Sequence, residues 1–212
     1  LNVKNGNNTN FTAFNATNNA GLTCIEVDNA AYSNSNWPNK DATASYSNDC
    51  DGGSEELTYV PDNNFEQALI ALGYDDVLDD YVSTSNISGV TNLDVSDSAI
   101  DDLTGIESFT GLTTLDCSIN NLTNLDLSSN TALDYLDCSR NDLSGLDLSN
   151  NPSLFYLNTA SNSLSSLDVS NNTLLIRLFC NYNSLTSLNV KNGNNTNFTA
   201  FNATNNAGLT CI

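Results

Sequence analysis

Leucines recur along the second half of the chain with a period of 21 residues. Three aligned blocks run over residues 112–132, 133–153 and 154–174, and a longer block begins at Leu175. Within each block the same early positions are apolar, and an asparagine follows them at a fixed place. This period is typical of a solenoid, in which one coil cannot bury its leucines alone but a stack of coils forms one core.

Each block predicts one short strand followed by an inward turn. Apolar residues two apart, such as Leu115 and Cys117, point to the same side of a strand. The asparagine that follows, Asn120 in the first block, can hydrogen-bond the backbone of its own turn and of the neighbouring coil. A block of 21 residues leaves little room for a helix, so we expect short strand or extended chain on the return side.

The repeated pattern LxxLDCSxNxLxxLDLSxNxx resembles the bacterial 21-residue leucine-rich repeats of the IRREKO type. The resemblance covers about residues 90–212, where the block at 90–111 is similar to the first repeat of such an array. It implies a leucine-rich repeat solenoid, mainly β with short parallel strands, and little helix apart from an N-terminal cap helix near 63–72. It also implies a secreted surface protein similar to those of Bacteroidetes and Flavobacteria, exported by type IX secretion.

A larger repeat relates the two ends of the chain. Residues 1–25, LNVKNGNNTNFTAFNATNNAGLTCI, recur letter for letter at 188–212. We interpret the chain as one period of a tandem array plus an overlap, with a module of about 187 residues, which is the spacing of the two copies. An artificial duplication is the alternative. Because the first residue is Leu1 and not methionine, we expect a fragment or a processed product.

The tandem interpretation divides the chain into six segments. From the N-terminus these are the last coils of a preceding module (1–25), its C-terminal cap (26–50), a linker (51–58), an N-terminal cap (59–92), the repeats (93–197) and a terminal coil that duplicates 11–25 (198–212). A helix in the N-terminal cap is predicted from the start signal Pro61-Asp62-Asn63 and the stop signal Gly73.

The six cysteines fall into two groups. Cys24 and Cys50 bracket the predicted C-terminal cap, and we expect them to form a disulfide in an exported protein. A disulfide between these two cysteines, which are 26 residues apart, would stabilise the fold by about 3–4 kcal/mol. Cys211 takes the place of Cys24 in the second copy, so its partner would lie further along the array. Cys117, Cys138 and Cys180 occupy the same position in their repeats. We expect them to be buried free thiols and not to form a zinc site.

The composition excludes several classes of function. The chain has 25 acidic and 5 basic residues, a formal net charge of −20, which argues against nucleic acid and anionic membranes as partners. It has no histidine, so the usual catalytic base and the commonest metal ligand are absent. No apolar run reaches the roughly 20 residues that a membrane span needs. We therefore expect a protein that is not an enzyme and has no direct membrane insertion. The resemblance implies that it is extracellular or on the cell surface.

Acidic clusters make Ca²⁺ the one cofactor candidate. Stacked coils place like carboxylates about 4.8 Å apart on the strand face, and weak Ca²⁺ binding is the functional interpretation. The alternative is that each aspartate accepts hydrogen bonds from a nearby turn. The candidates lie on the strand face and in the N-terminal cap, and they are Asp116, Asp137, Asp75, Asp76, Asp79 and Asp80.

Aromatic side chains gather beside the inward-facing leucines. These positions face solvent on the predicted sheet, where an aromatic patch can bind a protein or a sugar ring. Cross-strand packing that supports the sheet is the alternative. The predicted binding surface comprises Tyr135, Phe155, Tyr156, Ile176, Arg177, Phe179 and Tyr182. A separate modification candidate is Ser98, because Asp97-Ser98-Ala99 is similar to the O-glycosylation motif of exported Bacteroidetes proteins.

Together these features favour an extracellular leucine-rich repeat module of a large tandem-repeat surface protein, acting in adhesion or ligand binding. The expected partners are a protein or glycan ligand on the strand face and neighbouring copies of the same module. Two alternatives stay open. One is a structural stalk or self-assembling fibre module without a ligand, and the other is a glycan-holding accessory of a secreted enzyme.

Overall fold

The computed structural model of the protein describes residues 1–4, 6, 8–11, 13–48, 50 and 56–212. It divides into two compact units, Leu1–Glu56 and Leu57–Ile212, and each is considered by itself. Residues 51–55 of the predicted linker lie outside the described residues. Within the described ranges, no helix is both long enough and apolar enough to cross a membrane.

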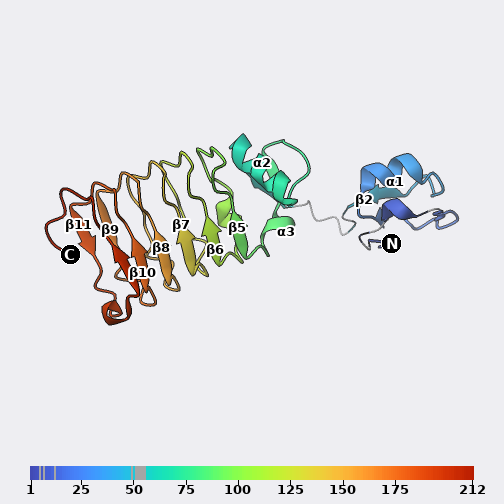
Figure 1. Ribbon diagram of the computed structural model, residues 1–212. Helices are drawn as coiled ribbons and strands as arrows, with labels where there is room; N and C mark the ends of the chain where they lie inside the picture. The colour runs from blue at the N-terminus through green and yellow to red at the C-terminus, as the bar shows by residue number, and fades with distance from the viewer. Residues whose placement is uncertain (5, 7, 12, 49, 51–55) are drawn as a thin grey trace. The chain divides into compact units, whose positions relative to one another are not determined.

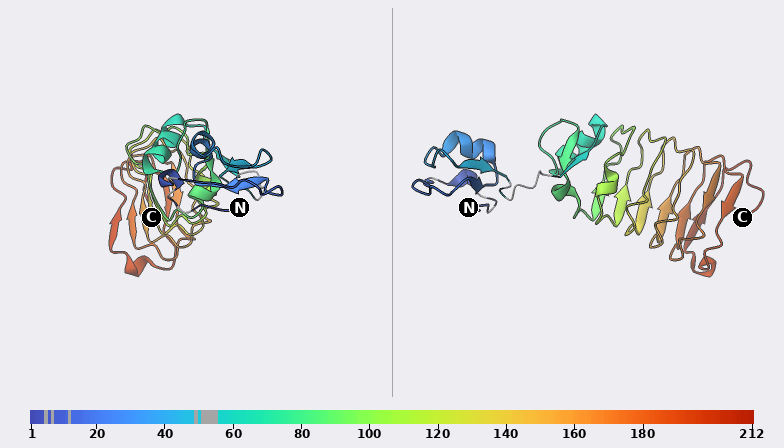
Figure 2. Two further views of the ribbon diagram at one scale, coloured as in Figure 1. Left: turned by 90° about the vertical axis from the view of Figure 1, so that its right-hand side faces the viewer. Right: turned by 180° about the vertical axis from the view of Figure 1, so that it is seen from behind.

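The larger unit is a leucine-rich repeat solenoid, as the 21-residue period predicts. Its coils stack in sequence order with one short strand per coil along one side (Figure 1), and Figure 2 shows the same succession from behind. Six of these strands form a parallel sheet in the order β12-β10-β8-β7-β6-β5, and β9 pairs with β11 in the second halves of their coils. The strands are β5 (Asn92–Asp94), β6 (Thr114–Asp116), β7 (Tyr135–Asp137), β8 (Tyr156–Asn158), β9 (Ser166–Asp168), β10 (Arg177–Phe179), β11 (Ser187–Asn189) and β12 (Ala200–Asn202).

Leucines at the strand centres form a continuous core along the stack. Each lies directly beside its counterpart in the next coil, and five in succession are fully buried: Leu93, Leu115, Leu136, Leu157 and Leu178. Burying one such side chain stabilises the fold by about 1.5–3 kcal/mol relative to leaving it exposed. The repeat therefore supplies a similar contribution at every coil.

An asparagine ladder closes the turns after the strands. The Asn141 Nδ2 atom donates to the carbonyl oxygens of Cys117 in the preceding coil (3.0 Å) and Cys138 in its own coil (3.1 Å). Its Oδ1 atom accepts from the backbone N–H of Leu122 (3.0 Å). The same donor pattern recurs at Asn120, Asn162, Asn183 and Asn206. These bonds satisfy backbone groups that would otherwise be buried without partners.

A second asparagine ladder, which the strand-and-turn pattern did not predict, follows in the other half of each coil. Asn130, Asn151 and Asn172 are fully buried. The Asn151 Nδ2 atom donates to the carbonyl oxygens of Leu127 (3.1 Å) and Asn130 (3.0 Å), both in the preceding coil. The coils are thus joined by side-chain amides at two places per period.

A helix and a hairpin cover the N-terminal end of the solenoid. α2 spans Asn63–Leu72, within the range predicted for the cap helix. Asp62 caps it through Oδ1, which accepts the N–H groups of Asn64 (2.8 Å) and Phe65 (3.1 Å), and Gly73 ends it with a φ of 81°. The remaining elements of this end are β3 (Leu57–Tyr59), β4 (Tyr81–Ser83), α3 (Thr84–Ile87) and the 3₁₀ helix η2 (Ile106–Ser108).

The hairpin corrects one predicted boundary. The linker was expected to extend through residue 58, but Leu57 and Thr58 belong to β3, which pairs antiparallel with β4. Thr58 is buried, and its hydroxyl hydrogen-bonds that of Thr84 at 2.8 Å. Because this strand helps to cover the end of the core, the N-terminal cap begins at Leu57.

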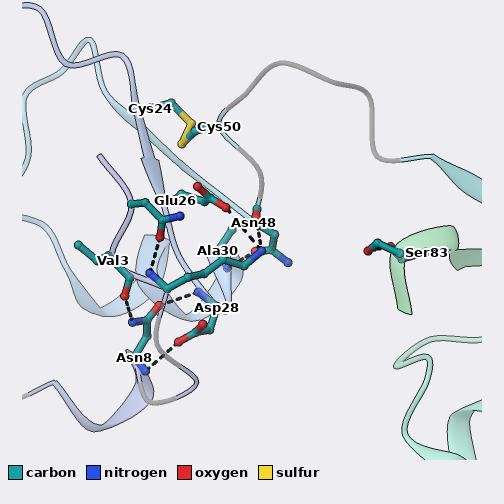
Figure 3. Close-up of polar contacts among 12 residues, drawn as sticks. Val3, Asn8, Cys24, Glu26, Asp28, Ala30, Asn48, Cys50 and Ser83 are labelled. Carbon is teal, nitrogen blue, oxygen red and sulfur yellow. Dashed lines mark hydrogen bonds and ion pairs between the residues drawn. A yellow bond between two sulfur atoms is a disulfide. The ribbon is translucent and has the colours of Figure 1, made fainter. Parts of the chain in front are cut away.

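The smaller unit is held by a disulfide and a cluster of aromatic rings. Cys24 and Cys50 form the disulfide (Figure 3). Trp37 is buried and stacks on Phe11 and Phe14, with ring centroids 5.3 and 4.8 Å away. The elements of this unit are η1 (Asn8–Asn10), β1 (Cys24–Glu26), α1 (Ala30–Asn36) and β2 (Ser45–Ser47), and β1 pairs parallel with β2.

Candidate binding surface

The exposed side of the six-stranded sheet carries two rows of side chains, one on each side of the buried leucine row. Residues that flank a buried strand centre point to the opposite face, so both rows face solvent. One row consists of Asn92, Thr114, Tyr135, Tyr156, Arg177 and Ala200. The other consists of Asp94, Asp116, Asp137, Asn158, Phe179 and Asn202.

Three rings from the predicted surface form one cluster, here called the aromatic cluster: Tyr135, Tyr156 and Phe179. Tyr135 and Tyr156 lie side by side on β7 and β8, with ring centroids 4.2 Å apart and planes 6° apart. Phe179 on β10 is the diagonal neighbour of Tyr156, at 5.9 Å and 48°. All three side chains are half-buried, so each both supports the sheet and presents part of its surface to solvent.

The charge of the side chains around the aromatic cluster changes along the sheet. Burial raises the pKa of Tyr135, and the Tyr156 side chain and the carboxylates of Asp137 and Asp116 raise it further. Its phenol therefore stays protonated and can donate a hydrogen bond at neutral pH. Asn158 follows the aspartates in the same row, so the negative charge is confined to the strands before β8. The sequence already held this signal, because Asn158 aligns with Asp116 and Asp137 in the repeat.

The other predicted surface residues lie around the aromatic cluster. Arg177 is exposed and lies in register with Tyr156, which places one positive charge beside the rings. Phe155 is 38% exposed and precedes β8, and the half-buried Ile176 precedes β10. Tyr182 is 60% exposed in the turn after β10, where its φ is 56°. Within residues 57–212, no ring contact joins Phe155 or Tyr182 to the aromatic cluster.

The strand-face aspartates that were calcium candidates close their own turns. The Asp116 Oδ1 atom accepts from the N–H (3.0 Å) and the hydroxyl (2.7 Å) of Ser118. The Asp137 Oδ1 atom accepts from the N–H of Ser139 (2.9 Å), and its Oδ2 atom accepts from the Asn158 amide (2.8 Å). Three of these four oxygen contacts are the turn bonds that the alternative interpretation predicts.

Two of the four cap aspartates also accept local hydrogen bonds. The Asp75 carboxylate accepts the N–H of Asp76 (2.9 Å), and that of Asp79 accepts the N–H of Tyr81 (3.1 Å). Burial raises the pKa of Asp75. Asp80 is exposed, with a φ of 69°. In the part of the chain that the structure describes, no three or more Asp, Glu, Cys or His side chains converge to hold a metal ion.

The ladder cysteines and Ser98 lie inside the repeat architecture. Cys117, Cys138 and Cys180 are free and fully buried, with Thr159 between the last two in the ladder. Burial raises the pKa of Cys180 to about 11, so its thiol stays protonated. Ser98 is half-buried, and its hydroxyl donates to the carbonyl oxygen of Ser96 (3.0 Å).

A polar hollow of about 450 Å³ lies beside η2, away from the predicted surface. Among its lining residues are three carboxylates, Asp102, Glu107 and Asp126. The Glu107 Oε2 atom accepts the N–H of Gly105 (2.9 Å), and the Asp126 Oδ1 atom accepts that of Ser128 (2.9 Å). The Asp102 Oδ1 atom accepts the N–H of Thr104 (2.9 Å), so all three carboxylates serve turns in this structure.

Solved structures similar to this chain include leucine-rich repeat proteins of Listeria. The functional domain of InlJ from Listeria monocytogenes, which includes a cysteine ladder, matches with a TM-score of 0.68 and 39% identity, over 75% of this chain and 36% of that one. An internalin (inlF) from the same species matches with a TM-score of 0.50 and 22% identity, over 60% of this chain and 45% of that one, which shows the fold alone. A scan for known protein families and a search of curated proteins find no match.

These comparisons place the fold among internalin-like leucine-rich repeat solenoids. The chain spans 36% and 45% of the length of the two matched chains. In this chain, Cys117, Cys138 and Cys180 occupy the same position in their coils.

Proposed function

We propose that the chain is an extracellular leucine-rich repeat module of a large tandem-repeat surface protein, and that it acts in adhesion by binding a protein ligand. The aromatic cluster carries this proposal, because it places Tyr135, Tyr156 and Phe179 from three adjacent strands on one open face. Solenoids use such extended faces for binding, and tyrosine and phenylalanine are enriched at the centres of protein interfaces.

Ring geometry favours a protein ligand over a glycan. A sugar ring stacks on an open aromatic face, but the near-parallel Tyr135 and Tyr156 rings, 4.2 Å apart, cover one face of each other. What they present is ring edge and phenol hydroxyl, which suits the mixed apolar and polar contacts of a protein interface. Asp116 and Asp137 in the neighbouring row favour a ligand with basic groups beside its apolar contact.

The wider context of the module belongs to the same proposal. The 21-residue pattern supports an IRREKO-type protein of Bacteroidetes exported by type IX secretion, and Ser98 is its candidate O-glycosylation site. We propose no catalytic role, because the chain has no histidine and the carboxylates lining the hollow beside η2 serve turns. The recurrence of 1–25 at 188–212 supports the tandem arrangement and also favours a stalk or fibre as the second candidate function.

Binding of the full chain tests the proposal. The chain is screened in parallel against a display library of purified extracellular proteins and against a glycan array. We expect a protein ligand whose affinity falls roughly 10- to 100-fold in the Tyr156→Ala variant, the usual loss for a central aromatic contact. Phe179→Ala should weaken the same ligand, and thermal melts of both variants check that the solenoid remains folded.

A matched control separates loss of contact from general change of the surface. Leu174 is 57% exposed in a turn outside the two strand-face rows, so Leu174→Ala should leave the affinity unchanged. Ligands found only on the glycan array, or a protein ligand that tolerates both Tyr156→Ala and Phe179→Ala, would contradict the proposed function.

A further inference from the structure

One residue in the turn after each strand of the six-stranded sheet has a left-handed backbone conformation. These residues are here called the turn row, and their φ values lie between 51° and 59°. Up to Tyr182, the N–H of each turn-row residue donates to a carbonyl oxygen of the next coil, as that of Arg140 does to Ala160 (2.8 Å). The turn row comprises Asp97, Ile119, Arg140, Ser161, Tyr182 and Asn205.

Several residue types in the turn row are poorly suited to this conformation. Asparagine and aspartate tolerate a positive φ because their short polar side chains bond the local backbone, whereas a β-branched residue there is a steric outlier. Asp97 and Asn205 fit this rule. Ile119, Arg140 and Tyr182 do not, so each holds a conformation that asparagine would adopt with less strain.

The core of the solenoid does not account for these three side chains. Ile119 is 43% exposed and Tyr182 is 60% exposed, so most of their bulk is not used to fill space inside the stack. Arg140 is exposed as well. Backbone strain of this kind concentrates at sites that bind or react, where the side chain itself is needed. The turn row is therefore a candidate contact surface.

The turn row borders the side of the sheet that carries the aromatic cluster. Arg140 follows Asp137, the last residue of β7, by three residues, which is at most about 10 Å of chain. The coils of Ile119 and Tyr182 are three steps of about 4.8 Å apart, so the two residues span about 14 Å along the stack. A protein interface of standard size covers about 800 Å² on each partner, a patch roughly 30 Å across. A protein ligand on the aromatic cluster therefore reaches the turn row.

Both arginines of the chain belong to this surface. Arg177 lies beside Tyr156 on the strand face, and Arg140 lies in the turn row. Among the residues that the structure describes, neither guanidinium group forms an ion pair or a hydrogen bond, although the formal net charge of the chain is −20. Arginine binds a carboxylate through two parallel hydrogen bonds, so these free groups favour a ligand that carries carboxylates.

We propose that the protein ligand of the strand face also contacts the turn row, with apolar side chains against Ile119 and Tyr182 and a carboxylate paired with Arg140. This inference rests on the proposed function and adds a charge pattern to the ligand. A basic group of the ligand faces Asp137, and an acidic group faces Arg140, within about 10 Å of each other. Such a pattern fixes the register of the ligand and disfavours partners of uniform charge.

Asparagine substitutions separate binding from folding at the turn row. Ile119→Asn and Tyr182→Asn replace a strained residue with the type that the chain has at Asn205. We expect each variant to melt about 1–3 °C above the parent, because the left-handed conformation becomes less strained. Each should also lose about tenfold in affinity for the protein that the parent selects from the display library of extracellular proteins. A gain of stability with a loss of affinity is the signature of a strained contact residue.

The charge contact has its own pair of variants. Arg140→Asn removes the charge and the strain together, and we expect about a tenfold loss of affinity for the same protein. Arg140→Lys keeps the charge but not the paired hydrogen bonds, so its affinity should lie between those of the parent and Arg140→Asn. Because salt screens an exposed ion pair, the affinity of Arg140→Asn should also depend less on ionic strength than that of the parent.

Ser161→Asn is the matched control. Ser161 occupies the same turn in the coil between Arg140 and Tyr182, is half-buried and has a φ of 59°. Its short side chain makes no contact in the proposal. This variant should melt at or above the parental temperature and keep the affinity within about twofold. An affinity loss as large as that of Tyr182→Asn would show that the turn backbone, and not the exposed side chain, determines binding.

The outcomes distinguish this inference from the proposed function. If Tyr156→Ala weakens the ligand but Ile119→Asn, Tyr182→Asn and Arg140→Asn do not, the ligand is confined to the aromatic cluster, and only this inference is wrong. If no protein is selected from the library, both are wrong. Lower melting temperatures for Ile119→Asn and Tyr182→Asn would show that these side chains support the fold, which would overturn the inference whatever the binding results.

Discussion

Residues 1–56 are held by one disulfide and a ring cluster around Trp37, whereas residues 57–212 have no disulfide and no tryptophan. The solenoid relies instead on leucines and asparagines that recur in every coil. Each of its coils contacts its neighbours in the same way, so its stability is spread along the stack. In the smaller unit, stability depends on one disulfide and one cluster of rings.

The two units can be followed separately, because each has its own spectroscopic signal. Trp37 is the one tryptophan of the chain and lies in the smaller unit, so its fluorescence reports on that unit alone. Eight of the strands belong to the solenoid sheets, so far-UV circular dichroism is dominated by the solenoid. A change in one unit can therefore be followed while the other serves as an internal control.

Cys50→Ser should separate the two units most strongly. The disulfide closes a segment with a sequence separation of 26 residues, and its loss should destabilise the smaller unit by about 3–4 kcal/mol from loop entropy. We expect the fluorescence of Trp37 to report unfolding at a much lower urea concentration, while the circular dichroism transition stays where it is in the parent. A common shift of both transitions would show that the two units unfold together.

Asn141→Ala should produce the converse effect. The Asn141 side chain joins two coils through bonds to Cys117, Cys138 and Leu122. Alanine leaves the Leu122 N–H buried without that partner and removes one of the two amide donors to each of the two carbonyl oxygens, which keep Asn120 and Asn162. Loss of such buried hydrogen bonds should cost about 2–3 kcal/mol of solenoid stability. The measurement is urea unfolding followed by circular dichroism, with the Trp37 transition unchanged.

Asn121→Ala is the matched control for this ladder. Asn121 is exposed, and its side-chain amide donates to the exposed Asp101 carboxylate at 2.9 Å. Its replacement should change the stability by less than about 0.5 kcal/mol, as is usual for surface sites. If Asn141→Ala were as mild as this control, the ladder would be a consequence of the stack and not a source of its stability.

Acid should weaken the solenoid through its turn aspartates. Hydrogen bonds from Ser128, Ser149 and Ser170 hold the pKa values of Asp126, Asp147 and Asp168 below the ordinary value of 3.8. Because these pKa values are lower in the folded state, the contribution to stability is present above 3.8 and is lost as the pH falls through the folded values. The effect should be small, since the groups are exposed, and melting temperatures of the solenoid between neutral and strongly acidic pH measure it.

Asp147→Asn tests the effect of the carboxylate charge separately from that of the turn hydrogen bond. The amide oxygen of asparagine can accept the same N–H, as Asn202 does from Thr204 in the last coil (3.1 Å). This variant should keep the melting temperature at neutral pH and show a shallower decline in acid. An unchanged acid slope would assign the pH dependence to other carboxylates, including Asp75, whose raised pKa acts with the opposite sign.

The sequence predicted the solenoid because its evidence is periodic. Leu115, Leu136, Leu157 and Leu178 repeat at one spacing, and a repeated pattern defines the strand, its register and the core row together. The second asparagine ladder was missed, although Asn130, Asn151 and Asn172 repeat at the same spacing, because asparagine is also common in exposed turns. The Oδ1 atoms of these three asparagines are buried without a hydrogen-bond partner. The rule that buried polar atoms are hydrogen-bonded would therefore not have predicted that these side chains are buried.

Features that occur once were harder to predict. The sequence placed Tyr135, Tyr156 and Phe179 on the same face, but not the near-parallel stacking of the two tyrosines, which depends on side-chain rotamers. Nor did it indicate that Thr58 is buried in a hairpin with β4, because a strand of three residues has no period to detect. The burial of Phe14 against Trp37 depends on packing between segments and leaves no periodic signal in the sequence.

Calcium should have the smallest effect, and it should be confined to the solenoid. We propose weak Ca²⁺ binding at most, because the Asp116 and Asp137 carboxylates already accept turn hydrogen bonds. Ca²⁺ at a concentration equal to its dissociation constant would stabilise the fold by about 0.4 kcal/mol, which raises the melting temperature by about 1 °C. Thermal melts with millimolar Ca²⁺ or with chelator measure this, and the Trp37 transition of the smaller unit is the control.

The variants locate any larger effect of calcium. A rise of several degrees that Asp137→Asn abolishes would mean that the strand-face row gives up its turn bonds to bind the ion. If Asp79→Asn abolishes it instead, the ion binds in the N-terminal cap, where Asp75, Asp76, Asp79 and Asp80 are close in sequence. The first outcome would place a cation beside the aromatic cluster, reverse the local charge and remove the argument for a basic ligand. The second would leave that argument intact and make calcium a stabiliser of the solenoid end.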